Sequence, residues 1–240
     1  MLHRTRGIVL HSVKFSETSL IVRIYTEAFG IQSYMVKGAR SPKSKFKPVF
    51  FQPMTLLELV VYRKERNVLQ SIREIRMPHP YQSVPFDIRK SSISLFMDEV
   101  VYRSLREEEP NPSLFVFLWD SCLLLDKADE PFHHFHLLFA MKLTRHLGFR
   151  PRTECTRESC YFNLAEGTFQ PLFVADVCLD REGSQTWRRL DEWPLETPAV
   201  PGLAPKDRDA MLDAVLRYYR FHLPGLSGFH SAEVLHQVLS

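Results

Sequence analysis

Apolar and polar positions alternate with a period of two through the first 76 residues, the pattern of half-buried strands. Leu20, Val22 and Ile24 are the clearest example. The pattern predicts strands over Thr5–Val13, Ser19–Thr26, Ile31–Val36, Met54–Tyr62 and Val68–Arg76. Hairpin-length connections and one longer loop join these five strands, which predicts a small barrel. An OB-type barrel is the first choice and an SH3-like barrel the second.

From Phe86 onward the period changes to 3.6, which indicates helices. One helical face is marked by Ile93, Phe96, Met97, Val100, Val101 and Leu105. Ser113–Lys127 is apolar nearly all round, so we expect it to be a buried central helix. Further helices are predicted over Phe132–Leu147, from Pro205 to about His222, and from Ser231 through Leu239.

The predicted fold class is α+β. An N-terminal five-stranded OB-type β-barrel over residues 1–78 is followed by a mostly α-helical domain over residues 79–240. This second domain contains an insert at about residues 150–203, which is predicted to be irregular. The insert holds three of the four cysteines, short aromatic stretches and several prolines.

Charge divides the chain at the same place. Residues 1–78 hold 14 Lys/Arg against 5 Asp/Glu, a net charge of +9, whereas the remainder has a net charge of −6. Such asymmetry predicts that the first part binds a polyanion. No apolar run reaches the roughly 18 to 20 residues that cross a bilayer, and the start lacks a signal-peptide core. We therefore expect a cytoplasmic protein with no membrane partner.

The densest basic segment runs from Lys37 to Lys47 and contains no acidic residue. A flexible glycine and hydroxyl groups beside the cations are suited to phosphate oxygens. The predicted DNA-binding residues are Lys37, Gly38, Arg40, Lys43, Ser44, Lys45 and Lys47, joined by Arg63, Lys64 and Arg66 from the turn between the last two strands. Tyr25, Tyr34, Phe46 and Tyr62 are candidates for base stacking, although barrel core is the better interpretation for any one of them.

Several motifs resemble the RecO family of bacterial repair proteins. At the start these are Gly7-Ile8-Val9-Leu10, Ser16-Glu17-Thr18-Ser19, Gly30 and Val36-Lys37-Gly38-Ala39-Arg40 with Lys43-Ser44. At the end they are Tyr218-Tyr219-Arg220, His222-Leu223-Pro224-Gly225 and Ser231 through Val234-Leu235. The resemblance implies an OB-fold domain, a helical C-terminal domain and a nucleoid-associated protein. It also implies binding of single- and double-stranded DNA, strand annealing, and partnership with RecR and single-strand-binding protein (SSB) in loading RecA, with no catalytic centre.

The cysteines depart from the pattern of that family, in which many members hold zinc with two C-x2-C pairs. Here Cys155 and Cys160 are spaced C-x4-C, Cys178 stands alone, and Cys122 lies in a predicted buried helix. Structural zinc needs four closely placed ligands, so we predict no metal and no cofactor. The stretch from Cys160 to Phe169 is predicted to form a small hairpin whose apolar contacts replace the metal.

The histidines invite an enzymatic interpretation that their spacing does not favour. His133 and His136 are not spaced i, i+4 with a carboxylate between them, as in H-E-x-x-H. We therefore expect His133, His134 and His136 to be solvated or to line a groove. Two alternatives to a DNA-binding mediator stay open: a metal-dependent nucleic-acid enzyme, and an RNA-binding OB-fold adaptor.

The predicted helix over residues 132–147 places Lys142 and Arg145 beside Phe135, Phe139 and Leu143. An apolar groove with a basic rim suits an acidic peptide with an aromatic end. In the family that the chain resembles, the C-terminal tail of SSB is such a peptide. These five residues are therefore the predicted SSB-tail site, with core packing as the alternative explanation of the apolar ones.

Overall fold

The structure is a computed structural model that describes residues 1–41, 44–63, 68–105, 109–129, 131–152, 154, 160–226 and 228–239. Its contacts divide the chain into two compact units. We call Met1–Asp87 with Leu105–Asp126 the barrel unit, and Ile88–Ser104 with Lys127–Ser240 the helical unit.

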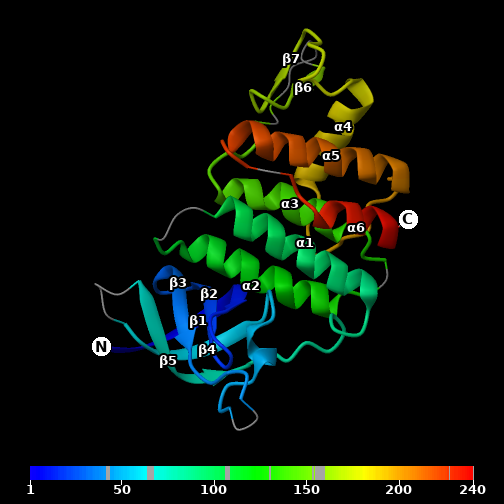
Figure 1. The fold of residues 1–240 in the computed structure, drawn as a ribbon. Helices are drawn as coiled ribbons and strands as arrows, with labels where there is room; N and C mark the ends of the chain where they lie inside the picture. Colours follow the sequence, from blue (N-terminus) through cyan, green and yellow to red (C-terminus); the bar gives the residue numbers. More distant parts are fainter. Residues whose placement is uncertain are drawn as a thin grey trace. The chain divides into compact units, whose positions relative to one another are not determined.

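Five strands form the closed barrel of the barrel unit, drawn in blue to cyan in Figure 1. They are β1 (Leu2–Lys14), β2 (Leu20–Thr26), β3 (Gly30–Val36), β4 (Leu56–Tyr62) and β5 (Leu69–Arg76). Their order around the barrel is β1-β2-β3-β5-β4, with β3 and β5 parallel and the other neighbouring pairs antiparallel. This confirms the predicted OB-type barrel, and every strand begins and ends within three residues of its predicted bounds.

The barrel closes because β1 is long and bent. Its first half pairs with β4 and its second half with β2, and the register shifts between Val9 and His11. An extra residue of this kind bends a strand and increases its twist. Gly7 lies before the register shift and pairs with both Thr26 on β2 and Leu57 on β4, and an added Cβ there would come within 2.7 Å of the Ile24 side chain. The family-like glycine is therefore required by close packing inside the barrel.

Helix α2 (Pro112–Lys127) belongs to the barrel unit. The guanidinium of Arg6 on β1 lies 5.3 Å from the ring centre of Phe115 and 5.0 Å from that of Trp119. Glu27 holds this guanidinium through two hydrogen bonds of 2.9 and 2.7 Å. The helix is where the sequence predicts it, and its described contacts explain why it groups with the barrel. The domain boundary at residue 78 stays a prediction.

The helical unit contains α1 (Ile88–Ser104), α3 (Phe135–His146), α4 (Arg181–Glu192), α5 (Pro205–His222) and α6 (Ser231–Val238). α3 contacts α1, α4 and α5, and the Tyr219 hydroxyl on α5 donates to the Ala140 carbonyl on α3 at 2.8 Å. The predicted limits of α5 are confirmed, and α6 begins at the predicted residue and ends one residue before the predicted Leu239. Nowhere in the described chain is a helix both long and apolar enough to span a membrane.

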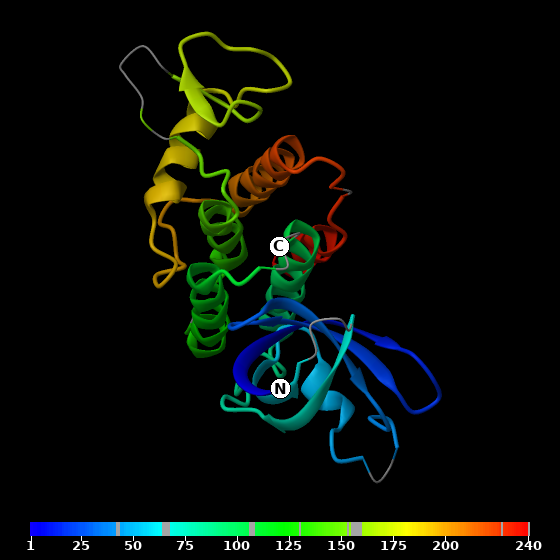
Figure 2. The ribbon, with the colours of Figure 1, turned by 90° about the vertical axis from the view of Figure 1, so that its left-hand side faces the viewer.

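The predicted insert is irregular over most of its described residues, but it also contains a helix that was not predicted. It holds α4 and the hairpin of β6 (Tyr161–Asn163) and β7 (Thr168–Gln170), which Figure 2 shows at one end of α4. The predicted hairpin is confirmed, and Phe162 anchors it by stacking on Trp187 of α4, with ring centres 4.6 Å apart. α4 has few apolar residues, so periodicity missed it. Its available signal was Asp180, which caps the helix by accepting from the Gly183 N–H at 2.7 Å.

Candidate nucleic-acid interface

The basic segment lies between β3 and the short 3-10 helix η1 (Pro48–Phe51). Gly38 has a φ of 69°, so the turn uses the left-handed conformation that favours glycine. The described cations of the segment are all exposed: Lys37, Arg40, Lys45 and Lys47. Ala39 is fully buried in the barrel core, and this burial fixes the turn that carries Lys37 and Arg40. Lys43 lies outside the described residues.

Hydrogen bonds connect this segment to the turn between β1 and β2 and to β5. The Arg40 backbone N–H donates to the Thr18 carbonyl at 3.0 Å, and the Arg40 guanidinium donates to the Glu17 carbonyl at 3.1 Å. Both acceptors lie in the turn between β1 and β2. The Lys45 ammonium donates to the Arg73 carbonyl on β5 at 3.2 Å. The structure therefore brings Arg40 next to the β1–β2 turn, a proximity that the sequence did not reveal.

Two other predicted contact residues have contacts within the barrel unit. The Ser44 hydroxyl donates to the Phe46 carbonyl at 2.8 Å and accepts from the Phe46 N–H at 3.2 Å, so it stabilises the loop itself. The Arg63 guanidinium lies 4.8 Å from the ring centre of Phe29. The other predicted cations of that turn, Lys64 and Arg66, lie outside the described residues.

The stacking candidates divide between core and surface. Tyr25 and Tyr34 are each 1% exposed, so barrel core, the preferred interpretation for any one candidate, is confirmed for these two, and burial raises the pKa of Tyr34. Tyr62 is 47% exposed, and Phe46 is partly buried beneath Lys45, whose ammonium lies 5.2 Å from the ring centre. Among the described residues of β1–β5 and of the turns that join these five strands, the most exposed Phe, Tyr or Trp is one that the sequence analysis missed: Phe15, at 59%.

The strand register defines the outer face of β1–β2–β3. Val13 pairs with Ile21, and Ile21 pairs with Met35. In the neighbouring row His11 pairs with Arg23, and Arg23 with Ser33. Because side chains alternate along a strand, these rows point away from the core that contains Val22 and Ile24. This face joins apolar and basic side chains beside the Lys37–Lys47 segment.

The outer face of β1–β4–β5 has a different charge pattern. Arg6 pairs with Glu58, and Glu58 pairs with Arg76 across the strands. A depression of about 420 Å³ here is lined by Arg4, Thr5, Arg6, Glu27, Glu58, Leu59, Val60, Glu74 and Arg76. Three arginines are thus matched by three glutamates, and the carboxylates oppose phosphate binding.

The predicted SSB-tail groove on α3 is not present as an exposed surface. Phe135, Phe139 and Leu143 are buried at 1%, 0% and 0% exposure, because α1, α4 and α5 pack around α3. Core packing, the alternative explanation, is correct for these three residues. The assignment of an exposed apolar groove to them was wrong.

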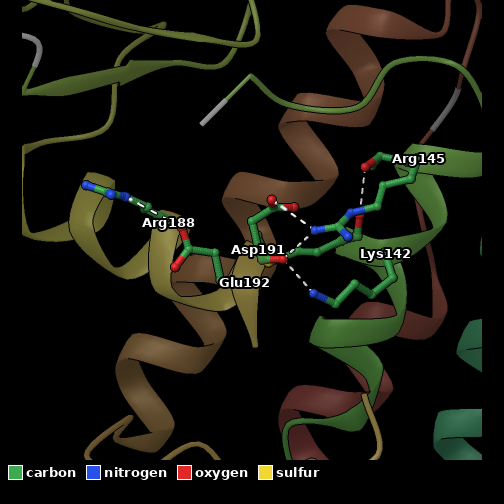
Figure 3. Close-up of polar contacts among 7 residues, drawn as sticks. Lys142, Arg145, Arg188, Asp191 and Glu192 are labelled. Carbon is green, nitrogen blue, oxygen red and sulfur yellow. Dashed lines mark hydrogen bonds and ion pairs between the residues drawn. The ribbon is translucent and has the colours of Figure 1, made fainter. Parts of the chain in front are cut away.

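The two cations of that predicted site contact the end of α4 instead (Figure 3). The Lys142 ammonium and the Arg145 guanidinium each donate to the Asp191 carbonyl at 2.5 Å. Arg145 also pairs with the Asp191 carboxylate at 3.0 Å, and the side chain of Asp191 is only 1% exposed. Burial, followed by the charge of Arg145, lowers the pKa of Lys142 to about 8. Cations at a helix C-terminus stabilise the helix, so Lys142 and Arg145 hold α4 on α3.

The histidines are less exposed than expected. His134 and His136 are almost fully buried, so their placement in solvent or in a groove was wrong. The Val200 N–H donates to Nδ1 of His134 at 3.0 Å, and burial lowers the pKa of His134 to about 4. Within the described residues, no three His, Cys, Asp or Glu side chains are grouped to hold a metal ion. Cys122, Cys160 and Cys178 are not disulfide-bonded, and Cys155 lies outside the described residues.

Comparison with known proteins accounts for almost the whole chain. Residues 1–81 match the family Recombination protein O N terminal, and residues 85–230 match Recombination protein O C terminal. The chain is 37% identical to the DNA repair protein RecO of Phocaeicola vulgatus over the full length of both. It is 36% and 34% identical to the proteins of the same name from Bacteroides fragilis and Flavobacterium psychrophilum, over 99% of each chain. The chain therefore belongs to the RecO family of DNA repair proteins.

Proposed function

We propose that this chain is a non-catalytic DNA-binding mediator of recombinational repair. It binds single- and double-stranded DNA through the barrel unit, anneals complementary strands, and assists RecA loading together with RecR and SSB. The observation that carries the proposal is the exposed cationic segment of Lys37, Arg40, Lys45 and Lys47 beside the outer face of β1–β2–β3. Membership of a DNA repair family supports DNA as the polyanion.

A salt titration of the full chain tests the DNA site. Affinity for a labelled single strand should fall steeply with NaCl, because each neutralised phosphate releases counterions. Lys37→Glu with Arg40→Glu should weaken binding to unrelated sequences alike and reduce the salt slope by up to about two units. The charge-matched control is Arg4→Glu with Arg76→Glu on the outer face of β1–β4–β5, which should change affinity little. Equal losses from both pairs would contradict the assigned surface.

An annealing assay tests the mediator role. Two complementary oligonucleotides should anneal faster with the protein present, with or without a chelator, because the proposal requires no metal. Metal-dependent loss of oligonucleotide integrity would support a nucleic-acid enzyme instead. Preference for structured RNA over single-stranded DNA would support an RNA-binding adaptor.

Partnership with the SSB tail is tested on the full chain with a labelled acidic tail peptide. We assign the tail to the helical unit. We assign no residues to its site, because α3 offers no exposed apolar groove. Saturable binding that survives Lys37→Glu with Arg40→Glu supports this assignment. Loss of tail binding in that variant, with the fold intact, would place the tail on the barrel.

A further inference from the structure

Phe15 is an aromatic side chain in solvent whose backbone position is fixed. The residue is 59% exposed, at the turn between β1 and β2. The Phe15 N–H donates to the Ser19 carbonyl at 3.0 Å, so the β1–β2 ladder continues to this residue. Leaving a large apolar ring exposed is unfavourable relative to burying it, and the barrel core does not require this ring.

Phe15 extends an apolar row on the outer face of β1–β2–β3. It follows Val13 by two residues, so both side chains point to the same side of the hairpin. Val13 is exposed and pairs with Ile21, which in turn pairs with Met35; both of these are partly exposed. We call Phe15, Val13, Ile21 and Met35 the apolar platform.

Cations border the platform on two sides. Lys37 comes two residues after Met35, and Arg40 is bound to the carbonyls of Glu17 and Thr18 in the turn that carries Phe15. His11 and Arg23 form the next row of the sheet. In the described β1–β2 hairpin, the carboxylate that neighbours the platform is that of Glu17, in the same turn as Phe15. An apolar surface with a basic rim fits a ligand that carries flat apolar groups on a polyanionic backbone.

We propose that the apolar platform, with Phe15 as its principal stacking residue, binds unpaired nucleobases while Lys37 and Arg40 bind the adjoining phosphates. This inference rests on the proposed function and adds to it a face of the barrel and a strand preference. In a duplex the bases are stacked on one another and paired, so they are not available to Phe15. The platform therefore favours single strands, and it does so without sequence preference because every base has a stacking face.

A second copy of the chain fits the platform less well. In a two-fold symmetric contact the same surface meets itself. Lys37, Arg40 and Arg23 of one copy would then face the same cations of the other. Like charges across an interface oppose association, whereas a polyanion is attracted by them.

Substitution at Phe15 in the full chain tests the platform. Phe15→Ala should weaken binding to a single-stranded oligonucleotide about 5- to 100-fold, the loss expected for one stacked base. Phe15→Trp should restore the affinity, and Phe15→Leu should not, because leucine is apolar but has no π-face. Affinity for duplex DNA should change less than about twofold in all three variants. The control is Phe221→Ala, an equivalent change at a 45% exposed phenylalanine on α5, which should leave affinity unchanged.

An oligonucleotide made of abasic sites separates the platform from the phosphate contacts. Wild type and Phe15→Ala should bind this probe equally, while Lys37→Glu with Arg40→Glu should still weaken binding. If Phe15→Ala binds normal single strands as tightly as wild type while the charge-reversed pair binds weakly, the platform is wrong and the proposed function stands. If wild type binds no DNA, the proposed function itself fails. A Phe15→Ala variant that changes oligomeric state with unchanged DNA affinity would show that the platform is a protein interface.

Discussion

The segment after β3 and helix α3 both place cations beside apolar side chains, yet the structure uses them differently. On the barrel, Lys37 and Arg40 project from a turn fixed by the buried Ala39. On α3, Lys142 and Arg145 converge on the carbonyl of Asp191, and the apolar residues beside them are buried by three helices. The first set is available to an external polyanion, and the second is satisfied by the chain's own helix end. The comparison shows that the surroundings of a cation decide its role, more than its sequence neighbours do.

The largest expected effect is on stability, when the contact between α3 and the end of α4 is removed. Arg145→Ala should lower the free energy of unfolding by about 3 kcal/mol, because it leaves the buried carboxylate of Asp191 without its guanidinium partner. Urea unfolding measures this loss. Asp191→Asn should cost less, because Arg145 is 32% exposed and can be solvated.

The control for that change lies on α4, the helix that carries Asp191. Arg188 and Glu192 form an exposed ion pair of 3.7 Å on α4, so Arg188→Ala should change stability by less than about 1 kcal/mol. DNA affinity should be the same in folded Arg145→Ala as in wild type. A tenfold loss of DNA affinity would mean that the helical unit contributes a DNA contact.

A smaller effect should appear in the dependence of stability on pH. Burial lowers the pKa of Lys142 from 10.5 to about 8 in the folded state. Between pH 8 and 10 the unfolded chain therefore binds more protons at this residue, and its contribution to stability rises with pH. Comparing the pH dependence of urea unfolding in wild type and Lys142→Met isolates this contribution. An identical slope in both proteins would show that Lys142 keeps an ordinary pKa.

The exposed cations of the barrel should contribute little to stability. Lys37→Glu with Arg40→Glu should change the free energy of unfolding by less than about 1 kcal/mol, since surface substitutions usually have small effects. The same variant should lose DNA affinity. A large fall in its melting temperature would indicate that the hydrogen bonds of Arg40 to the β1–β2 turn stabilise the fold, as the contacts of Lys142 and Arg145 on α3 do.

We expect metal removal to have no effect. The hairpin of β6 and β7 is anchored by Phe162 on Trp187, so a chelator should leave the melting temperature unchanged. Elemental analysis after purification without added metal should find less than one zinc per chain. Stoichiometric zinc would contradict this prediction and implicate Cys155, Cys160 and Cys178.

The strands and most helices were predictable because their apolar positions repeat with the period of the element itself. β2 shows this with Leu20, Val22 and Ile24, all of which lie in the barrel core. α4 was not predictable in the same way, since Trp187 and Leu190 are its main buried apolar side chains. The stacking candidates could not be separated from core residues for a related reason: alternation assigns Tyr34 to a face but does not say which face encloses the core.

The sequence by itself determined the barrel, the limits of α5, the start of α6 and the basic segment beside β3, because periodicity, turn residues and charge are local properties. Only the tertiary structure decided which cations are exposed and which aromatic side chains face solvent. Lys142 and Arg145 are bound because α4, some 50 residues later in the chain, ends against them. Phe15 is exposed because the hairpin extends past the core. Burial is a relation between distant segments, and the free energies of charge and apolar surface depend on it.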